Sequence, residues 1–312
     1  MKLQQLCETT QIPMPKRKLG KIPYDVSILS LGGQGSLETQ GTEKNCVEII
    51  ESAYQLGINY FDTSPIYGPS EDYYGKAMPS FRKNVFLASK TDDRTYDGSL
   101  RLLEKSLKRL KTDYLDLWQL HHIGDNIDLE KCMDKDGVIS ALLKMKEEKV
   151  VRHIGVTGHE NPLTLKTIIK EFDFDTILCP INAADIHNTP SFIKDLIPIA
   201  NQKRMGIIGM KVFSQGHIFN KNGLTTPWGP ISYALSQHVS TIIIGHDSVE
   251  QLRENVAIAK SFVQLTTNEL KDIEKKTKTY YKKASFFRSM YGGYNSRDKL
   301  SEPIQIVPNK HG

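Results

Sequence analysis

The sequence predicts an α/β fold, a closed (β/α)8 TIM barrel, from three observations. Eight short apolar runs rich in β-branched residues recur along the chain, and segments with helical periodicity separate them. From Ile28 to Ile243 is 215 residues over seven intervals, about 31 residues per unit, the usual length of a strand–helix–strand step. No break in composition divides the 312 residues, and eight units favour a closed barrel over an open doubly wound sheet.

The elements follow in order from the amino terminus. Residues 17–27 resemble a short hairpin that could close the lower end of the barrel. Continuous apolar runs, typical of parallel strands buried on both faces, predict the eight strands at 26–33, 58–64, 85–90, 114–122, 152–158, 176–180, 205–213 and 241–245. Helical periodicity is clear over 45–57 and 100–111, and a further helix is expected at about 267–282.

We expect residues 1–312 to form a single domain, with 1–16 and 283–312 as flexible extensions. The tail contains the aromatic residues Phe286, Phe287, Tyr291 and Tyr294 among glycines and polar residues. Such a tail is either a disordered end or a flap over the barrel mouth, and the sequence leaves both open.

Composition excludes several classes of protein. A hydrophobic content of 39% and a charged content of 25% are those of a soluble globular protein. The net charge of +5 comes from scattered lysines, so we expect no nucleic-acid partner, and no apolar run is long enough to span a membrane. The amino terminus lacks the apolar stretch of a signal peptide, which predicts a cytoplasmic protein. The four cysteines, Cys7, Cys46, Cys132 and Cys179, have no metal-ligand spacing and are predicted to be reduced thiols.

Four polar residues stand where predicted strands end. Asp62 and Tyr67 follow the second strand, Lys90 ends the third and His121 ends the fourth. The carboxyl ends of barrel strands form one mouth, where TIM-barrel enzymes have their active sites. Each residue alone would more often be a cap, a packing residue or a solvated charge. Their coincidence on three successive strands favours a catalytic site.

The segments "GINYFDTSPIYGPSE", "VFLASK" and "LKTDYLDLWQLHH" resemble, in this order, the signature segments of the aldo-keto reductases. The resemblance extends over about residues 18–260 and implies a (β/α)8 barrel that binds NADP(H) across its mouth and reduces carbonyls. The catalytic tetrad of the family falls on Asp62, Tyr67, Lys90 and His121.

Physical chemistry gives these four residues consistent roles. A phenol has a pKa of about 10, and a nearby ammonium such as Lys90 favours the phenolate form. A buried Lys90 needs a partner, which Asp62 can provide. Tyr67 could then donate a proton to a carbonyl oxygen that His121 orients.

A catalytic metal is not expected. His121 and His122 would face opposite sides of a regular strand, and His159 and His187 are not spaced as ligands. The family usually has a tryptophan at the position of His122, so the resemblance implies an altered wall of the substrate pocket.

No GxGxxG motif stands in a Rossmann context, and the glycines of 32–36 fit plain turn residues. The resemblance implies cofactor contacts at the ends of the later strands. Where relatives clamp the nicotinamide with a Ser-Asn pair and a Gln, this chain has Thr157–Gly158 and Cys179, with Asn182 as the nearest amide. Met210 replaces a stacking tyrosine, Lys211 could face the pyrophosphate or be a solvated lysine, and Gly216 belongs to the matched "Gln-Gly".

The adenosine end is implied to lie at 245–255. Ser248 and Gln251 fit a capping box, and a helix amino terminus suits an anion. The positions at which the family holds the 2′-phosphate correspond to Gly245, His246 and Gln251, so the usual cationic anchors are missing, although His246 or Arg253 could compensate. Asp247 would favour a bare ribose hydroxyl. The positions that contact the adenine correspond to Glu254 and Asn255. The expected cofactor is NADP(H), with NAD(H) as the alternative.

The sequence thus predicts an NADP-dependent oxidoreductase that reduces an aldehyde or ketone, or catalyses the reverse reaction. Two alternatives remain: a cofactor-binding sensor of the same fold, and a lyase that forms a Schiff base at Lys90. The small-molecule carbonyl or alcohol substrate, the direction and the oligomeric state are not specified. Trp118 is predicted to lie in the core, and Trp228 fits either the core or the pocket.

Overall fold

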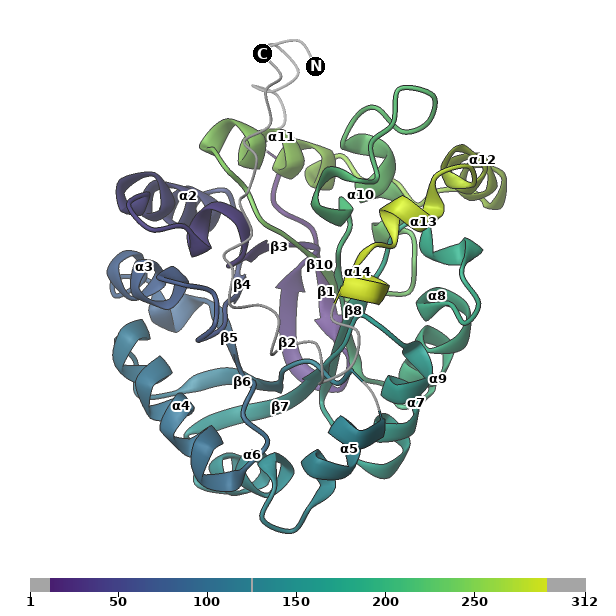
Figure 1. Cartoon of the computed structure of the whole chain (residues 1–312). Coiled ribbons are helices and arrows are strands. Elements are labelled where there is room, and N and C mark those ends of the chain that lie inside the picture. The colour runs from purple at the N-terminus through teal and green to yellow at the C-terminus, as the bar shows by residue number, and fades with distance from the viewer. Residues whose placement is uncertain (1–11, 125, 291–312) are drawn as a thin grey trace.

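The computed structural model describes residues 12–124 and 126–290 and shows a closed parallel barrel of eight strands (Figure 1). The strand order around the barrel is β10-β3-β4-β5-β6-β7-β8-β9, and pairing of β9 with β10 closes it. The predicted fold class is therefore confirmed. The barrel strands are β3 (Leu29–Gly32), β4 (Tyr60–Asp62), β5 (Phe86–Thr91), β6 (Leu115–Leu120), β7 (Val151–Thr157), β8 (Thr176–Pro180), β9 (Gly206–Met210) and β10 (Thr241–Ile244).

Helices surround the barrel and cover the outer face of the sheet (Figure 1). They are α2 (Glu43–Gln55), α3 (Ser70–Ala77), α4 (Tyr96–Leu110), α5 (Asn126–Met133), α6 (Val138–Glu147), α7 (Pro162–Glu171), α8 (Phe192–Asp195), α9 (Ile197–Gln202), α10 (Trp228–Leu235), α11 (Val249–Lys260), α12 (Thr267–Thr277), α13 (Tyr281–Ala284) and α14 (Phe287–Met290). Short 3-10 turns are η1 (Gly35–Glu38), η2 (Arg82–Asn84), η3 (Asp185–His187) and η4 (Ser214–Gly216). Among the described helices, α4, α7, α8, α11 and α12 begin with a side-chain cap, and on α12 Thr266 and Glu269 form a reciprocal capping box.

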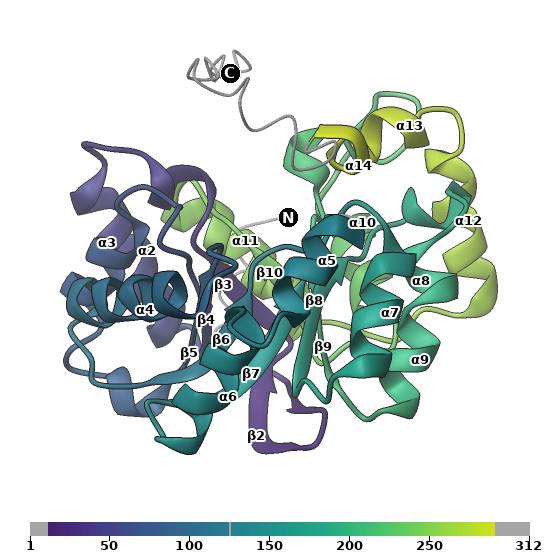
Figure 2. The ribbon, with the colours of Figure 1, turned by 60° about the horizontal axis from the view of Figure 1, so that its bottom comes forward.

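The predicted hairpin is present as β1 (Lys16–Leu19) and β2 (Ile22–Ser27), at the end of the barrel opposite α13 and α14 (Figure 2). It closes the barrel with apolar side chains, because it contributes Leu19, Ile22 and Val26 to a buried cluster with residues of five barrel strands, β4, β5, β6, β8 and β9. Gly20 adopts a φ of +58°, and a Cβ there would lie 2.2 Å from the backbone nitrogen of Gly206. Only glycine fits this close approach.

The first predicted strand, 26–33, is in fact two elements. Val26 and Ser27 pair with β1 in the hairpin, and the barrel strand begins only at Leu29. Both pieces are apolar and buried, so their hydrophobicity alone did not reveal the bend between them. The predicted helix 267–282 is likewise divided, into α12 and α13.

The described part of the tail packs against the barrel. Phe287 is fully buried, and Arg288 donates hydrogen bonds to Asp185 at 2.6 Å and to the carbonyl of Pro190 at 2.8 Å. The hydroxyl of Tyr280 donates to the carbonyl of Ile218 at 3.0 Å. Residues 279–290 thus brace the loops that follow β8 and β9. Tyr291 and Tyr294, together with most of the two predicted extensions, lie outside the described residues.

Candidate active site

The carboxyl ends of β4, β5 and β6 bring three of the four predicted catalytic residues together. The strands pair in register, with Asp62 opposite Ala88 and Lys90 opposite Gln119. All are parallel, so the last residues of each strand reach the same end of the barrel. Asp62, Lys90 and His121 are each at most 6% exposed.

Lys90 and Asp62 form a buried ion pair. The ammonium of Lys90 donates to one carboxylate oxygen of Asp62 and, at 2.8 Å, to the carbonyl of Thr63. The other carboxylate oxygen accepts a hydrogen bond of 2.9 Å from the side-chain amide of Gln119. Burial lowers the pKa of Lys90, and the charge and hydrogen bond of Asp62 oppose that shift. The pair therefore holds a cation in an interior that would otherwise disfavour it.

The sequence analysis did not identify Gln119. It is fully buried within β6, where its neighbours Trp118 and Leu120 are apolar. A polar amide inside an apolar strand was the available signal, because a buried amide needs a partner. The structure provides that partner in Asp62.

Tyr67 is held over the ion pair by the turn that begins α3. Gly68 has a φ of +48°, and a Cβ there would lie 2.4 Å from the carbonyl oxygen of Glu38, so the turn requires glycine. The ammonium of Lys90 lies 4.8 Å from the centre of the Tyr67 ring. The hydroxyl of Tyr67 lies 3.4 Å from Nε2 of His121. The four residues predicted from the sequence therefore form one contiguous cluster.

His121 is neutral in this environment. Burial is the main reason that its pKa lies well below the usual value, and the charge of Lys90 lowers it further. A neutral imidazole carries one N–H, and Nε2 is the ring nitrogen that faces the phenol. His121 can therefore exchange hydrogen bonds without adding a positive charge to the site.

Arg94, in the loop after β5, fixes the strand end that carries the histidines. Its guanidinium donates to the carbonyls of His121 at 2.6 Å and His122 at 2.8 Å and forms a bidentate ion pair with Asp128. This residue was also missed in the sequence, where Arg94 stands among the charged residues of a loop. Its role depends on Asp128, which lies 34 positions away in α5.

The ring of His122 stacks on that of His159, with centroids 4.7 Å apart and planes inclined by 16°. In the described part of the chain, no group of three or more His, Cys, Asp or Glu side chains is arranged to hold a metal ion. Nε2 of His187 lies 2.9 Å from the backbone carbonyl of Glu274, which is a structural contact.

Within residues 12–124 and 126–290, no helix has the length and apolar character needed to cross a membrane.

Comparison with known proteins matches residues 29–230 to the aldo/keto reductase family. This chain belongs to that family. The predicted resemblance is thus confirmed. An uncharacterized oxidoreductase of Bacillus subtilis, YqkF, is 30% identical, with 85% of this chain and 97% of that protein covered. L-galactose dehydrogenase of Arabidopsis thaliana is 28% identical, with 77% and 86% covered.

Solved structures of aldo-keto reductases share the fold. The holo form of AKR11C1 from Bacillus halodurans aligns with a TM-score of 0.71 and 24% identity, covering 84% of this chain and 96% of that one. An aldo-keto reductase of Klebsiella pneumoniae in complex with NADPH has a TM-score of 0.70 and 22% identity, covering 85% and 95%.

The residues predicted for the nicotinamide end of this aldo-keto reductase follow β7, β8 and β9. The hydroxyl of Thr157 is buried and has no hydrogen-bond partner within the described residues. The amide of Asn182 donates to the carbonyl of Lys211 at 3.1 Å and accepts from the backbone N–H of Ala184 and of Asp185. Asn182 therefore already braces its own loop, which leaves it one N–H for a ligand.

The loop after β9 has an unusual backbone. Lys211, Ser214 and Gln215 adopt φ values of 56°, 50° and 51°, in the left-handed region, and Gly216 follows with 87°. Non-glycine residues in this region cost free energy and cluster at ligand clamps. Met210 and Lys211 are partly buried, so Lys211 is not a freely solvated side chain. Burial lowers the pKa of Lys211, and Glu38 opposes that shift.

Gly158, between β7 and α7, is the remaining residue predicted for this end. A Cβ at Gly158 would lie 3.0 Å from the side chain of Leu165, so this position packs closely against α7. Trp118 is fully buried, as predicted for a core residue. Trp228 is 52% exposed, which excludes the core alternative for it.

The residues predicted for the adenosine end gather at β10 and the start of α11. Ser248 caps α11 by accepting from the N–H of Gln251 at 3.3 Å. The side chain of Gln251 returns to the N–H of Asp247 at 3.0 Å instead of that of Ser248, so only half of the predicted capping box forms. His246 is buried, and burial lowers its pKa to about 3, so His246 cannot serve as the cationic anchor considered above.

Asn255 and Glu254 differ in their surroundings. Asn255 is 4% exposed, and its side-chain oxygen has no partner among the described residues, whereas Glu254 is exposed on α11. Gly245 is exposed and stands directly after β10.

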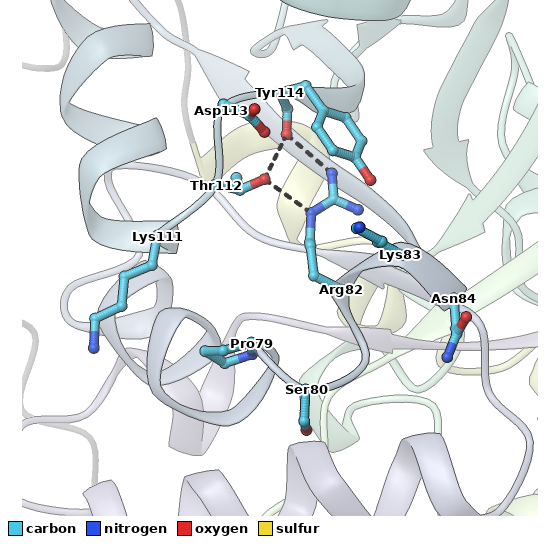
Figure 3. A pocket seen from close by; sticks show the side chains of 9 residues that line it. All are labelled: Pro79, Ser80, Arg82, Lys83, Asn84, Lys111, Thr112, Asp113 and Tyr114. Carbon is cyan, nitrogen blue, oxygen red and sulfur yellow. Dashed lines mark hydrogen bonds between the residues drawn. The ribbon is translucent and has the colours of Figure 1, made fainter.

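Two hollows lie at the other end of the barrel, away from the catalytic cluster. One, of about 680 Å³, is lined by Pro79, Ser80, Arg82, Lys83, Asn84, Lys111, Thr112, Asp113 and Tyr114 (Figure 3). The other, of about 620 Å³, shares Asp113 and Tyr114 with it. Arg82 is committed to structure there, because it binds the buried Asp116 at 2.8 Å and the carbonyl of Tyr114 at 2.9 Å. In this fold that end serves stability, so we do not place the reaction there.

Proposed function

We propose that this aldo-keto reductase reduces an aldehyde or ketone to an alcohol, or catalyses the reverse, with a nicotinamide coenzyme and Tyr67 as the proton donor. The arrangement of Tyr67 carries the proposal. Its hydroxyl lies 3.4 Å from His121 and its ring 4.8 Å from the ammonium of Lys90, in a cluster that is almost fully buried.

The residues of the cluster account for the movement of one proton. The Tyr67 hydroxyl donates its proton to the carbonyl oxygen of the substrate, and a phenolate remains. The Lys90 ammonium stabilises that phenolate, and Asp62 keeps Lys90 charged and in place. The neutral His121 orients the carbonyl and stabilises negative charge that develops on its oxygen.

The coenzyme, when bound, supplies the hydride that is added to the carbonyl carbon. Members of this family use NAD(P)H, and the Klebsiella pneumoniae structure contains NADPH, in line with the sequence-based choice of NADP(H). Three buried groups lack hydrogen-bond partners within the described residues: the Thr157 hydroxyl, the His246 ring nitrogens and the Asn255 side-chain oxygen. They would form hydrogen bonds with the bound coenzyme. Gly158, Asn182, Met210, Lys211, Gly216, Gly245, Gln251 and Glu254 complete the proposed contacts.

The Schiff-base alternative is disfavoured by the geometry of Lys90. A nucleophilic amine must be neutral and free, whereas the Lys90 ammonium is paired with Asp62 and donates to the Thr63 carbonyl. The sensor alternative stays open for the test below, because the amide of Asn182 is largely committed to its own loop.

The substrate class is a small carbonyl compound or alcohol. The names of two relatives indicate sugar substrates: L-galactose dehydrogenase and the D-arabinose 1-dehydrogenase of Saccharomyces cerevisiae. The second relative matches only 48% of this chain. The polar pair of His122 and His159 beside the cluster is compatible with a hydroxylated substrate. A single domain over 1–312 and a cytoplasmic location remain predictions.

Tyr67→Phe tests the proposal. The variant retains the ring and removes the proton donor, so coenzyme affinity should persist while reduction of an aldehyde falls by roughly 100-fold or more. Coenzyme binding is read from quenching of intrinsic fluorescence, and turnover from oxidation of the reduced coenzyme. Binding without turnover by the unchanged protein, over a panel of aldehydes and ketones, would favour the sensor. Turnover by the variant at the full rate would remove Tyr67 from its role.

A further inference from the structure

The amino terminus of α11 is already occupied by acceptors of the chain itself. In TIM barrels the loops after the seventh and eighth strands often bind a phosphate at a helix amino terminus, and here these strands are β9 and β10. The N–H of Gln251 donates to Ser248, and the N–H of Asp247 donates to the Gln251 side chain. The pKa of Glu250 is lowered by hydrogen bonds, first from its own backbone N–H and then from Ser248. These donors are therefore not available to a phosphate.

The charge around this terminus is negative. Residues 245–255 include three carboxylates, Asp247, Glu250 and Glu254, and one guanidinium, Arg253. Asp247 is fixed by a hydrogen bond of 2.6 Å from the hydroxyl of Ser36, and its backbone carbonyl accepts from the side chain of Asn45 at 3.1 Å. Lys44, next to Asn45, is an exposed cation on the facing helix α2.

The candidate cations of the described residues near this terminus are each limited. Arg253 is exposed on α11, and its charge is offset by that of Glu250. His246 is held neutral by burial, as described above. The loop after β3 passes directly over Gly245, where a Cβ would lie 2.7 Å from the carbonyl oxygen of Gln34. A lysine or arginine side chain at 245 would therefore displace this loop. Lys211 lies after β9, and its electrostatic partner is Glu38.

A ligand is nevertheless expected beside these carboxylates. His246 is 1% exposed and Asn255 is 4% exposed, yet both ring nitrogens of His246 and the side-chain oxygen of Asn255 lack partners among the described residues. Buried polar groups in native proteins are nearly always satisfied, by a ligand or water where the protein provides no partner. The site thus combines unsatisfied neutral groups with fixed negative charge.

We infer that the adenosine end of this site selects a free ribose 2′-hydroxyl over a 2′-phosphate, so that the protein binds NADH in preference to NADPH. The inference rests on the proposed function and specifies its coenzyme. A carboxylate accepts hydrogen bonds from ribose hydroxyls, and Asp247, held through one oxygen by Ser36, presents the other. The same carboxylate, together with Glu250, repels a phosphate dianion. This departs from the preference for NADP(H) that the sequence favoured.

Binding to the full chain tests the inference without any turnover. Dissociation constants for NADH and NADPH are measured by intrinsic fluorescence, and those for ADP-ribose and its 2′-phosphate by calorimetry, so that the nicotinamide plays no part. We expect the unphosphorylated member of each pair to bind at least about tenfold more tightly at low salt, and the difference to shrink as salt screens the charges.

Variants identify the residues responsible. Asp247→Asn and Glu250→Gln each remove one carboxylate charge with little change of shape, and each should reduce the preference several-fold, mainly by tightening binding of the phosphorylated ligand. Glu269→Gln is the control, because Glu269, like Glu250, is a carboxylate in the first turn of a helix, but that helix is α12. It should leave the preference unchanged.

The outcomes are distinct. Equal or tighter binding of NADPH by the unchanged protein would overturn the inference and leave the proposed reduction intact. A preference for NADH that neither carboxylate variant alters would also overturn it, because the charges would then have no role. If neither coenzyme bound, the proposed function and the inference would both be rejected.

Discussion

The ion pair of Lys90 and Asp62 can be removed as a unit, by combining Lys90→Met with Asp62→Asn. A single substitution would leave one charge buried without its partner, which typically costs about 3–5 kcal/mol of stability. The double variant has no charge at positions 62 and 90, and it keeps the Gln119 side chain next to a polar group at position 62. It therefore separates the electrostatic role of the pair from its role in folding.

The expected effect on rate follows from the position of Lys90. Its ammonium lies 4.8 Å from the centre of the Tyr67 ring. At that separation, with an effective dielectric constant of about 20, two unit charges interact by about 3.5 kcal/mol. If the phenol loses its proton in the transition state, loss of this attraction lowers kcat by roughly 300-fold. Substrate binding should change much less, because the neutral phenol gains little from the ammonium.

The assay is oxidation of NADH or NADPH with a simple aldehyde, at saturating and limiting aldehyde, so that kcat and KM are obtained separately. Circular dichroism and the thermal midpoint confirm folding. The matched control is the double variant Lys146→Met with Asp175→Asn. It removes an ion pair of 2.6 Å at the opposite end of the barrel and should leave kcat unchanged.

A folded Lys90→Met/Asp62→Asn variant with the kcat of the unchanged protein would refute the reasoning. So would an equal loss of kcat in the control, because the effect would then follow from general destabilisation of the barrel. A rise in KM with kcat preserved would assign the pair to substrate binding instead of proton transfer.

Two further predictions concern stability. Burial raises the pKa of Asp175, but hydrogen bonds from His153, Lys146 and the N–H of Ile154 outweigh this and lower it to about 2. The folded pKa lies below the unfolded one, so this stabilisation is present above about pH 4 and is lost as the pH falls through about 2. Asp175→Asn should therefore lower the free energy of unfolding by about 2 kcal/mol at pH 7, measured by urea unfolding. The same loss at pH 2 would show that the ionised carboxylate is not its cause. Arg288→Met leaves the fully buried Asp185 without its ion pair and should lower the free energy of unfolding by about 3 kcal/mol, measured in the same way. Arg288→Lys keeps a cation beside Asp185 and should lower it less.

Local pattern in the sequence predicted most of the fold. Apolar runs at regular spacing correspond to all eight barrel strands, because continuous hydrophobicity and short length are properties of each buried strand by itself. The run at 26–33 shows the limit of this reasoning. Val26 and Leu29 are equally buried, and only pairing with β1 assigns Val26 to the hairpin and not to the barrel.

The candidate site was predictable where position along a strand determines position in space. Asp62, Lys90 and His121 end consecutive strands, so their convergence follows from the barrel. The roles of Gln119 and Arg94 could not be assigned from the sequence, because they depend on partners in other elements, Asp62 for the first and the His121 carbonyl for the second.

The sequence by itself determined the barrel and the identities of the residues at its mouth, since strand period and strand ends are local properties. The tertiary structure decided the state of those residues. It made His246 neutral, turned Gln251 toward Asp247, and brought the backbone of Gln34 close to Gly245. Burial, charge and hydrogen bonding depend on neighbours distant in the chain, and these neighbours are known only once the barrel has closed.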